Sequence, residues 1–339
     1  MSRPARPHGR HLRSGVTAAT VAIAIAAACG SPASAPRSTP RISATPAISS
    51  PLPLPGLPAL VFLIEGSGDR LGALLVSRPG EPGALTSVGL PPGAWRPGAA
   101  LGRGGTLLLS EARRVLVGRL DGALVAPLWT RALLPGEPLG SGGAGSVPIG
   151  PACLPDASLA VVFGDGLTIV PPSGPVRAAV PAGARGDCAM PRPAELLYET
   201  EAFHRLASWD PASGSVAISA SECDGLTVGG GAIACLEGPG GLASAVGVWQ
   251  RRPIEPARPA FGPLVARLAA TSGSSVTGVC LSSDAAWLAL TEVGPSAEPS
   301  AGPSAAPRLR VLQGTPAGYV ERVRVALPAG ALLVGFVED

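Results

Sequence analysis

The side chains best suited to acid–base chemistry lie in one short segment, residues 198–205. This segment contains Glu199, Glu201 and His204, and the other two histidines of the chain lie within its first 28 residues. In a strand, Glu199 and Glu201 would share one face, because side chains alternate at a period of two. Two carboxylates beside an imidazole could bind a cation or move a proton. These three residues are therefore the candidate ligand site, and the alternative is a solvent-facing hairpin loop.

Cysteine chemistry is the second possibility, because the chain has six cysteines. One follows an apolar segment near the start, and the other five are Cys153, Cys188, Cys223, Cys235 and Cys280. An odd number in an oxidising compartment leaves at least one cysteine outside intramolecular disulfides. Cys223 and Cys235 flank a glycine-rich stretch that we interpret as a crossing between two repeats, so they could form a local disulfide. The alternative is that the downstream cysteines are small buried core residues.

Other catalytic patterns fail on their context. Residues 140–145 fit the letters of a G-x-G-x-x-G phosphate loop, but they lead into Val-Pro-Ile-Gly-Pro rather than into a helix. The sequence has no Cys-x-x-Cys pair of the kind that binds zinc, and no Gly-x-Ser-x-Gly elbow that would expose a nucleophilic serine. We therefore expect no metal and no cofactor, and we assign no catalytic residue.

The first 28 residues are typical of an export signal. Four arginines and no acid precede an apolar run over residues 15–28, which is too short for the roughly 20 residues of a transmembrane helix. The run ends at Ala26-Ala-Ala-Cys29, which resembles the lipobox of bacterial lipoproteins, although leucine is usual at the position of Ala26. This resemblance implies a signal peptide over residues 1–28 and a lipid attached to Cys29. The alternative is an ordinary secretory signal cut near Ala28 or Ala35.

Residues 29–57 are rich in proline, serine and alanine, so we expect a semi-rigid tether with nothing large to bury. A similar composition at residues 294–307 predicts a low-complexity loop insertion. The formal charge is +3, but six of the 26 basic residues precede residue 58 and all 23 acidic residues follow it. The remainder is therefore mildly acidic, which argues against a nucleic-acid partner. Arg113-Arg114 and Arg251-Arg252 are interpreted as solvated turns.

From residue 58 onward, short runs of valine, leucine and isoleucine alternate with glycine, proline and aspartate clusters, which predicts an all-β fold. Four of the downstream cysteines each precede a turn and an apolar run, and they recur at roughly 40 residues, as propeller blades do. We therefore expect these four, Cys153, Cys188, Cys235 and Cys280, to take equivalent inner positions of the ring. Tight turns recur one strand later, for example at Trp209-Asp-Pro-Ala-Ser-Gly214. The pattern divides the domain into six units of about four strands: 58–90, 91–136, 145–182, 183–225, 226–273 and 274–328.

Two of these segments carry a family resemblance. Ser282-Ser-Asp-Ala-Ala-Trp-Leu-Ala289 resembles the inner turn of bacterial β-propellers related to WD repeats, and Trp209-Asp-Pro-Ala-Ser-Gly214 resembles their outer hairpin. The resemblance implies a β-propeller over residues 58–339. The first unit lacks its innermost strand, so we expect the apolar run 331–337 to pair with residues 59–64 and close the ring. The alternatives are a β-sandwich and a seven-bladed propeller.

The function expected from these observations is a lipid-anchored protein on the extracytoplasmic face of the cell membrane. Its partners would be the bilayer, through acylated Cys29, and an envelope protein or cell-wall polymer, and we expect a monomer. The propeller would be a non-catalytic binding or scaffolding module. The alternative is a glycan-active hydrolase or lyase that uses carboxylates at the mouth of the ring, with Asp156, Asp187, Glu199 and Glu201 as its candidate acids. A small-ligand sensor is a third class, which the aromatic content of 4% disfavours.

Overall fold

A computed structural model describes most of the chain beyond residue 52. The described ranges are 53–66, 70–95, 100–111, 114–132, 153–156, 159–163, 167–180, 184–192, 195–200, 205–210, 213–238, 243–256, 258–294 and 306–338. All of them belong to one unit, Ser49–Asp339. The predicted signal peptide, Cys29, most of the tether and nearly all of the 294–307 insertion lie outside these ranges.

The described strands form six four-stranded antiparallel sheets, which we name A to F in sequence order. Sheet A is β24 (Ala331–Val337), β1 (Ala59–Glu65), β2 (Leu71–Arg78) and β3 (Glu81–Val88); sheet B is β4 (Ala100–Leu101), β5 (Thr106–Glu111), β6 (Arg114–Asp121) and β7 (Leu124–Ala132); sheet C is β8 (Cys153–Asp156), β9 (Leu159–Phe163), β10 (Leu167–Val170) and β11 (Arg177–Val180). A short 3-10 turn, η1 (Arg103–Gly105), precedes β5.

The second half of the chain repeats this order. Sheet D is β12 (Ala184–Arg192), β13 (Glu195–Thr200), β14 (Arg205–Trp209) and β15 (Val216–Glu222); sheet E is β16 (Asp224–Gly229), β17 (Ala232–Glu237), β18 (Ala245–Arg251) and β19 (Phe261–Ala269); sheet F is β20 (Ser275–Leu281), β21 (Trp287–Val293), β22 (Arg308–Thr315) and β23 (Gly318–Ala326).

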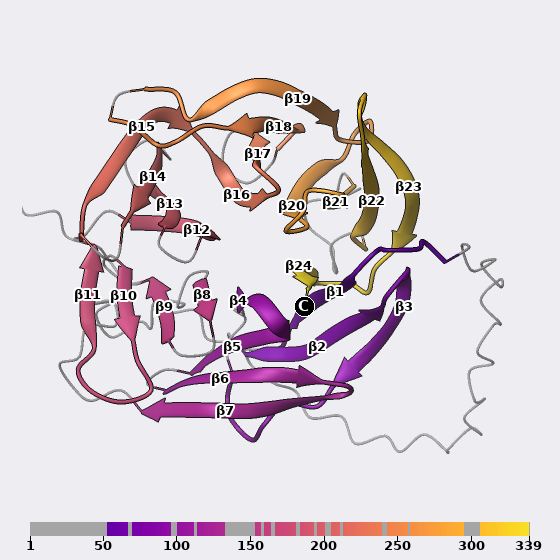
Figure 1. Ribbon diagram of the computed structural model, residues 1–339. Helices are drawn as coiled ribbons and strands as arrows, with labels where there is room; N and C mark the ends of the chain where they lie inside the picture. Colours follow the sequence, from indigo (N-terminus) through magenta and orange to yellow (C-terminus); the bar gives the residue numbers. More distant parts are fainter. Residues whose placement is uncertain are drawn as a thin grey trace, which may run out of the picture. The chain divides into compact units, whose positions relative to one another are not determined.

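The sheets stand side by side around a centre (Figure 1). The first strand of each sheet contacts the first strands of its neighbours, in the closed cycle β4, β8, β12, β16, β20, β24 and back to β4. Sheet A takes its first strand from the C-terminal end of the chain. Radially placed four-stranded sheets of this kind define a β-propeller, so the prediction of an all-β propeller is confirmed.

The ring closes where β24 pairs with β1. Leu60 lies opposite Phe336 and Leu63 opposite Leu332, so the predicted pairing of the two ends of the domain is confirmed. The C-terminal end also joins two other sheets, because the Glu338 carbonyl accepts a hydrogen bond from Gly104 N (3.0 Å) and its carboxylate accepts one from Ser283 N (2.6 Å). Closure removes the exposed edge that β1 would otherwise present.

Burial decreases from the inner strands to the outer strands where the structure describes it. In β1 the first five residues are all buried, whereas β19 at the outer rim is mostly exposed. This explains why the inner strands read as continuous apolar runs instead of alternating ones. Sheets A and F share a cluster that includes Phe62, Trp287 and Phe336, and sheets A and B share another.

The two segments that resemble propeller turns lie where that family places them. Residues 282–286 connect β20 to β21, where Ser282 N donates to Trp287 O (2.9 Å). The segment after Trp209 connects β14 to β15, and Gly214 closes it with a φ of +71° that glycine adopts without strain.

Two details of the sequence interpretation were wrong. Cys153, Cys188 and Cys280 lie in first strands, but Cys235 lies in β17, the second strand of sheet E. The stretch between Cys223 and Cys235 is therefore the first hairpin of sheet E and not a crossing between sheets. In this sheet Cys223 directly precedes the first strand, β16, and the cysteine of the repeat, Cys235, lies one strand later. No helix among the described residues is long and apolar enough to span a membrane.

Candidate functional site

A cavity of about 490 Å³ opens between sheets D and E. Its wall on one side is the β14–β15 hairpin, and on the other side it is the start of β17 with the end of β18 and the segment that follows. The lining residues are Ser208, Trp209, Asp210, Ser215, Ala217, Gly231, Arg251, Arg252, Pro253 and Ile254. The volume falls within the roughly 300–1,000 Å³ typical of small-molecule sites.

The sheet D wall is held by its hairpin. Asp210 N donates to Ser215 O (3.0 Å), and Gly214 N donates back to Asp210 O (2.8 Å). The Asp210 carboxylate also accepts a hydrogen bond from Ser213 Oγ (2.7 Å). The backbone bonds hold the hairpin at the edge of the cavity, and the Ser213 hydroxyl orients the Asp210 carboxylate.

The sheet E wall is held by backbone hydrogen bonds around two consecutive arginines. Arg251 N donates to Gly231 O (2.8 Å), and Arg252 N donates to Ala260 O (2.9 Å). The second bond folds the 252–260 segment back toward β19. Gly262 lies close to the neighbouring strand, because a Cβ at that position would lie 3.0 Å from Gln250 O.

The 252–260 segment also joins sheet D. Ala260 N donates to Ser221 Oγ (3.0 Å), and Ala220 N donates to Arg258 O (3.1 Å). At the two ends of this segment, in β18 and β19, the rings of Trp249 and Phe261 stack with their centroids 4.5 Å apart. The two walls of the cavity are thus bonded to each other, and the cavity has a fixed shape.

Two hydrogen-bond donors of the site have no acceptor or ion-pair partner within the described part of the chain. Trp209 is 4% exposed, and its indole N–H has no hydrogen-bond partner among the described residues. The Arg252 guanidinium forms no ion pair within the described part of the chain, and Arg252 is exposed. A buried donor without an acceptor is costly. The arrangement is therefore suited to a ligand rich in hydrogen-bond acceptors.

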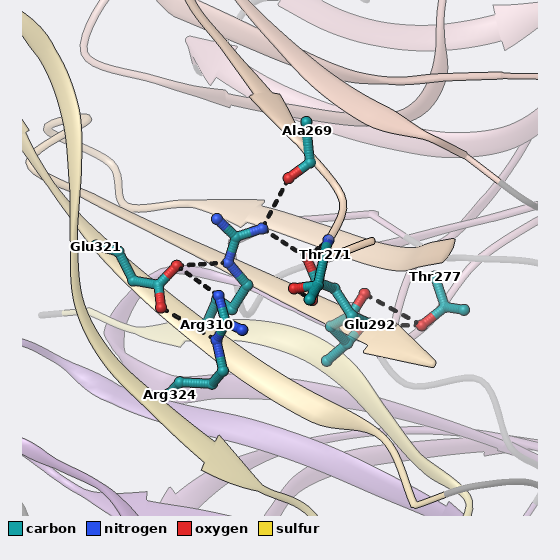
Figure 2. Close-up of polar contacts among 8 residues, drawn as sticks. Ala269, Thr271, Thr277, Glu292, Arg310, Glu321 and Arg324 are labelled. Atoms are coloured by element: carbon teal, nitrogen blue, oxygen red, sulfur yellow. Dashed lines mark hydrogen bonds and ion pairs between the residues drawn. The ribbon is translucent and has the colours of Figure 1, made fainter. Parts of the chain in front are cut away.

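A second polar cluster lies at the other side of sheet E (Figure 2). Arg310 donates to the Glu292 carboxylate (2.5 Å), to the Glu321 carboxylate (2.7 Å) and to Ala269 O (2.9 Å). Thr271 donates to Glu292 through both its hydroxyl (2.6 Å) and its backbone N–H (3.2 Å). Every charged group in the cluster is paired, so it braces sheet F against the end of sheet E.

The pKa values in this cluster follow from its pairing. Burial alone would raise the pKa of the Glu292 carboxyl, but the hydrogen bonds from Thr271 and Arg310, with the positive charge of Arg310, outweigh burial and lower that pKa. The pKa of Glu321 is lowered in the same way by Arg324 and Arg310. Both carboxylates therefore stay ionised, and the pairing is complete at neutral pH.

The candidate ligand residues from the sequence are only partly described. Glu199 lies in β13, opposite Arg185 in β12 and Leu206 in β14. Glu201 and His204 lie outside the described residues, as does Cys29. Cys223 and Cys235, the pair singled out from the sequence, form a disulfide with 5.3 Å between their Cα atoms.

The interpretation of the arginine pairs as solvated turns was wrong at two described positions. Arg251 is half-buried at the end of β18 and lines the cavity with Arg252. Arg114 pairs with Glu111 (2.7 Å) and lies over the Trp95 ring, 4.7 Å from its centroid. The sequence signal that could have located the cavity is the outer hairpin at Trp209. The sequence predicted it as a turn but did not indicate that it forms one wall of a cavity.

The fold and site define an all-β propeller with a polar cavity between two of its sheets. No family model matches the sequence, and no curated protein matches it. Among solved structures, the nidogen/laminin complex is similar with a TM-score of 0.54 at 10% identity, covering 82% of this chain and 97% of that chain. The β-propeller domain of Cps50 (Swd1) from Myceliophteria thermophila gives a TM-score of 0.46 at 12% identity, covering 82% and 89%.

The N-terminal domain of Nup159 matches with a TM-score of 0.41 at 10% identity, over 66% of this chain. The match spans 60% of that domain, which is less than two thirds of its length. At such identities the similarity defines the fold alone.

Proposed function

We propose that this protein is a membrane-anchored extracytoplasmic lipoprotein whose propeller, with each of its six sheets as one blade, is a non-catalytic binding or scaffolding module. The observation that carries the binding role is the cavity between sheets D and E, which has a fixed shape and unsatisfied donors. The partner would be an envelope protein or a cell-wall polymer, since these are what an anchored extracytoplasmic domain meets.

The anchoring part of the proposal rests on the sequence around Cys29 and on how the chain enters the domain. Leu54 N donates to Gly80 O (2.8 Å), and Gly80 N donates to Leu57 O (2.9 Å). Leu57 is buried in the cluster between sheets A and F. The last residues of the predicted tether are therefore fixed to the domain, which supports a tether that holds the propeller at one defined point.

Metabolic labelling with radioactive palmitate in a bacterial host tests the anchor. We expect label in the wild type and in the neighbouring control variant Ser31→Ala, and none in Cys29→Ala, because the diacylglycerol is attached to the Cys29 thiol. The Cys29→Ala protein should also leave the membrane fraction. Equal labelling of the wild type and Cys29→Ala would overturn lipidation.

Co-sedimentation with insoluble cell-wall material tests the binding module. We expect the wild type and Arg322→Ala, which alters an exposed arginine of sheet F far from the cavity lining, to sediment equally. The cavity variant Arg252→Ala should remain in the supernatant. Equal sedimentation of all three proteins would remove the cavity from the binding role.

A glycan-active enzyme is the second candidate. Asp156 lies in β8 and Asp187 in β12, and these neighbouring first strands contact each other. Hydrolysis of a glycosidic bond needs two carboxyl groups roughly 5–9.5 Å apart. Release of reducing ends from cell-wall glycans by the wild type, and its loss in Asp187→Asn, would favour the enzyme over the binding module.

A further inference from the structure

We propose that the cavity between sheets D and E binds a carboxylate-bearing sugar unit of the uronic acid type. This inference rests on the proposed binding function and names its ligand class. It follows from three kinds of group that meet in one cavity: guanidinium cations, groups that bond sugar hydroxyls, and apolar surface.

The cations select a negative charge. The lining includes two arginines, Arg251 and Arg252, and one aspartate, Asp210, so the charged residues of the lining carry a net positive charge. The planar guanidinium fork matches the two oxygens of a carboxylate and can bond both at once. Arg252 has no carboxylate partner within the described part of the chain, which leaves its fork available for a ligand.

The remaining polar groups match hydroxyls. Ser208 can donate and accept, and Ser215 Oγ, whose proton bonds Ser213 Oγ (2.8 Å), can accept, while Asp210 adds a carboxylate to the lining. The indole N–H of Trp209, a residue of the lining, is buried without an acceptor, so its signal should respond to a ligand in the cavity. A simple inorganic anion would use the arginines but would leave Asp210 facing a like charge.

Apolar surface completes the lining. Trp209, Ala217, Pro253 and Ile254 contribute carbon atoms to the same cavity. A pyranose ring presents C–H groups on its faces and hydroxyls at its edge, so it suits a site of this mixed character. The carboxyl end of a peptide shares the charge but not the ring of hydroxyls, and it is the competing ligand in the test.

The test uses ¹⁵N-labelled full-length protein in detergent micelles, with the indole N–H signal of Trp209 assigned by Trp209→Phe. The titrants are sodium D-glucuronate, neutral D-glucose of the same ring size, and N-acetylglycylglycine as a peptide carboxylate. We expect glucuronate to shift the Trp209 signal in a saturable way, and the other two to shift it at least tenfold less effectively.

Two arginine variants separate the cavity from general charge. Arg252→Ala should weaken glucuronate binding by about tenfold or more, as loss of a charge-assisted hydrogen bond does. Arg258→Ala removes the same charge from an exposed residue of the same segment, whose guanidinium bonds Glu255 (2.6 Å), and should change binding by less than about twofold.

Three results would overturn the proposal: glucose binding as well as glucuronate, the peptide binding in preference to it, or no saturable shift with any titrant. Equal loss in Arg252→Ala and Arg258→Ala would also overturn it. Because cell-wall sedimentation and palmitate labelling are measured separately, their failure would count against the proposed function and not against this ligand class alone.

Discussion

Sheet E has two neighbours, and its two interfaces are built differently. Toward sheet F, valine and leucine side chains fill the space and the Glu292–Arg310 pair closes one end. Toward sheet D, a smaller apolar cluster contains the Cys223–Cys235 disulfide, which closes the β16–β17 hairpin; the 252–260 segment bonds to sheet D, and one end is hollow. The filled interface stabilises the ring, and the hollow one leaves room for a ligand.

The difference has a physical reason. A cavity forfeits the dispersion contacts that its lining would otherwise make. At the sheet D interface a covalent crosslink and hydrogen bonds between backbone and side chain supply stability that packing does not. At the sheet F interface apolar side chains fill the space, and a charged pair is tolerated there because both Glu292 oxygens and the Nε and Nη1 atoms of Arg310 have hydrogen-bond partners.

Both interfaces of sheet E depend on closure of the ring, so deleting residues 330–339 should have the largest effect, because it disrupts both of them. The deletion removes β24 from sheet A and takes Phe336 out of the cluster between sheets A and F. Loss of a buried phenylalanine alone costs about 3–5 kcal/mol. We expect no cooperative thermal unfolding transition by circular dichroism, whereas Leu332→Ala, an exposed position on the same strand, should unfold like the wild type. An unchanged melting temperature in the deletion variant would contradict closure.

The next effect tests the filled interface. The Arg310 side chain is 11% exposed and that of Glu292 is 1% exposed. Arg310→Ala leaves the Glu292 charge buried without its cation, and we expect a loss of about 3–5 kcal/mol in the free energy of unfolding, measured in urea. The more exposed Arg267–Glu237 pair, which joins β19 to β17 within sheet E, is the matched control.

Arg267→Ala should cost less than about 1 kcal/mol, because solvent screens an exposed pair. The double variant Arg310→Met with Glu292→Leu should recover most of the loss, since removing both partners leaves no buried charge. Equal effects of Arg310→Ala and Arg267→Ala would mean that the Glu292–Arg310 pair is not buried as described.

Removing the disulfide at the interface of sheets D and E should lower the free energy of unfolding somewhat less than Arg310→Ala does. Replacing both Cys223 and Cys235 with serine opens a loop that spans a sequence separation of 12 residues. We expect a loss of about 3 kcal/mol in urea unfolding, from the chain-entropy model of crosslinking. Ser221→Ala, which removes only the hydrogen bond from Ala260 N, should cost about 1 kcal/mol.

The disulfide variant also sharpens the comparison through the cavity itself. Because the disulfide lies at the interface that forms the cavity, its removal should shift the Trp209 indole signal, while Arg310→Ala should leave that signal in place. A shift in both variants would mean that the two interfaces of sheet E are coupled and not independent.

The fold was largely predictable from sequence because its signals are local. The apolar run 331–337 had no repeat of its own, which predicted its pairing with β1. The hairpin after Trp209 and the turn at 282–286 each carry their glycine, proline or aspartate within six residues. Such patterns are read without knowing what lies across the ring.

The site was not predictable in the same way, because its parts are brought together only by the ring. Trp209 and Arg252 are on different sheets, and nothing in either segment indicates the other. Glu292 and Arg310 are separated by the low-complexity stretch, which hid the fact that they lie in adjacent strands, where Glu292 is opposite Arg308 and Arg310 is opposite Leu290. Arg251-Arg252 looked solvated because a sequence does not show that the next sheet stands beside it.

The smallest expected effect is seen in the ionisation of the two tyrosines of the chain at alkaline pH. Tyr198 lies in sheet D and Tyr319 lies in sheet F. Burial raises the pKa of Tyr198 to about 12, and burial together with the nearby Asp284 charge raises the pKa of Tyr319 to about 12. Since an unfolded tyrosine ionises near pH 10, the stability that each contributes is complete below pH 10 and is lost as the pH rises through about 12.

Absorbance at 295 nm during an alkaline titration measures this directly. We expect little phenolate near pH 10 and a rise centred near pH 12, or at the pH where the domain unfolds if that comes first. Tyr319→Phe should halve the amplitude and leave the same midpoint, because the remaining Tyr198 is buried on its own sheet. Phenolate formation near pH 10 in this variant would mean that sheet D is open to solvent at Tyr198, and the hollow interface would then extend further into the ring than the cavity does.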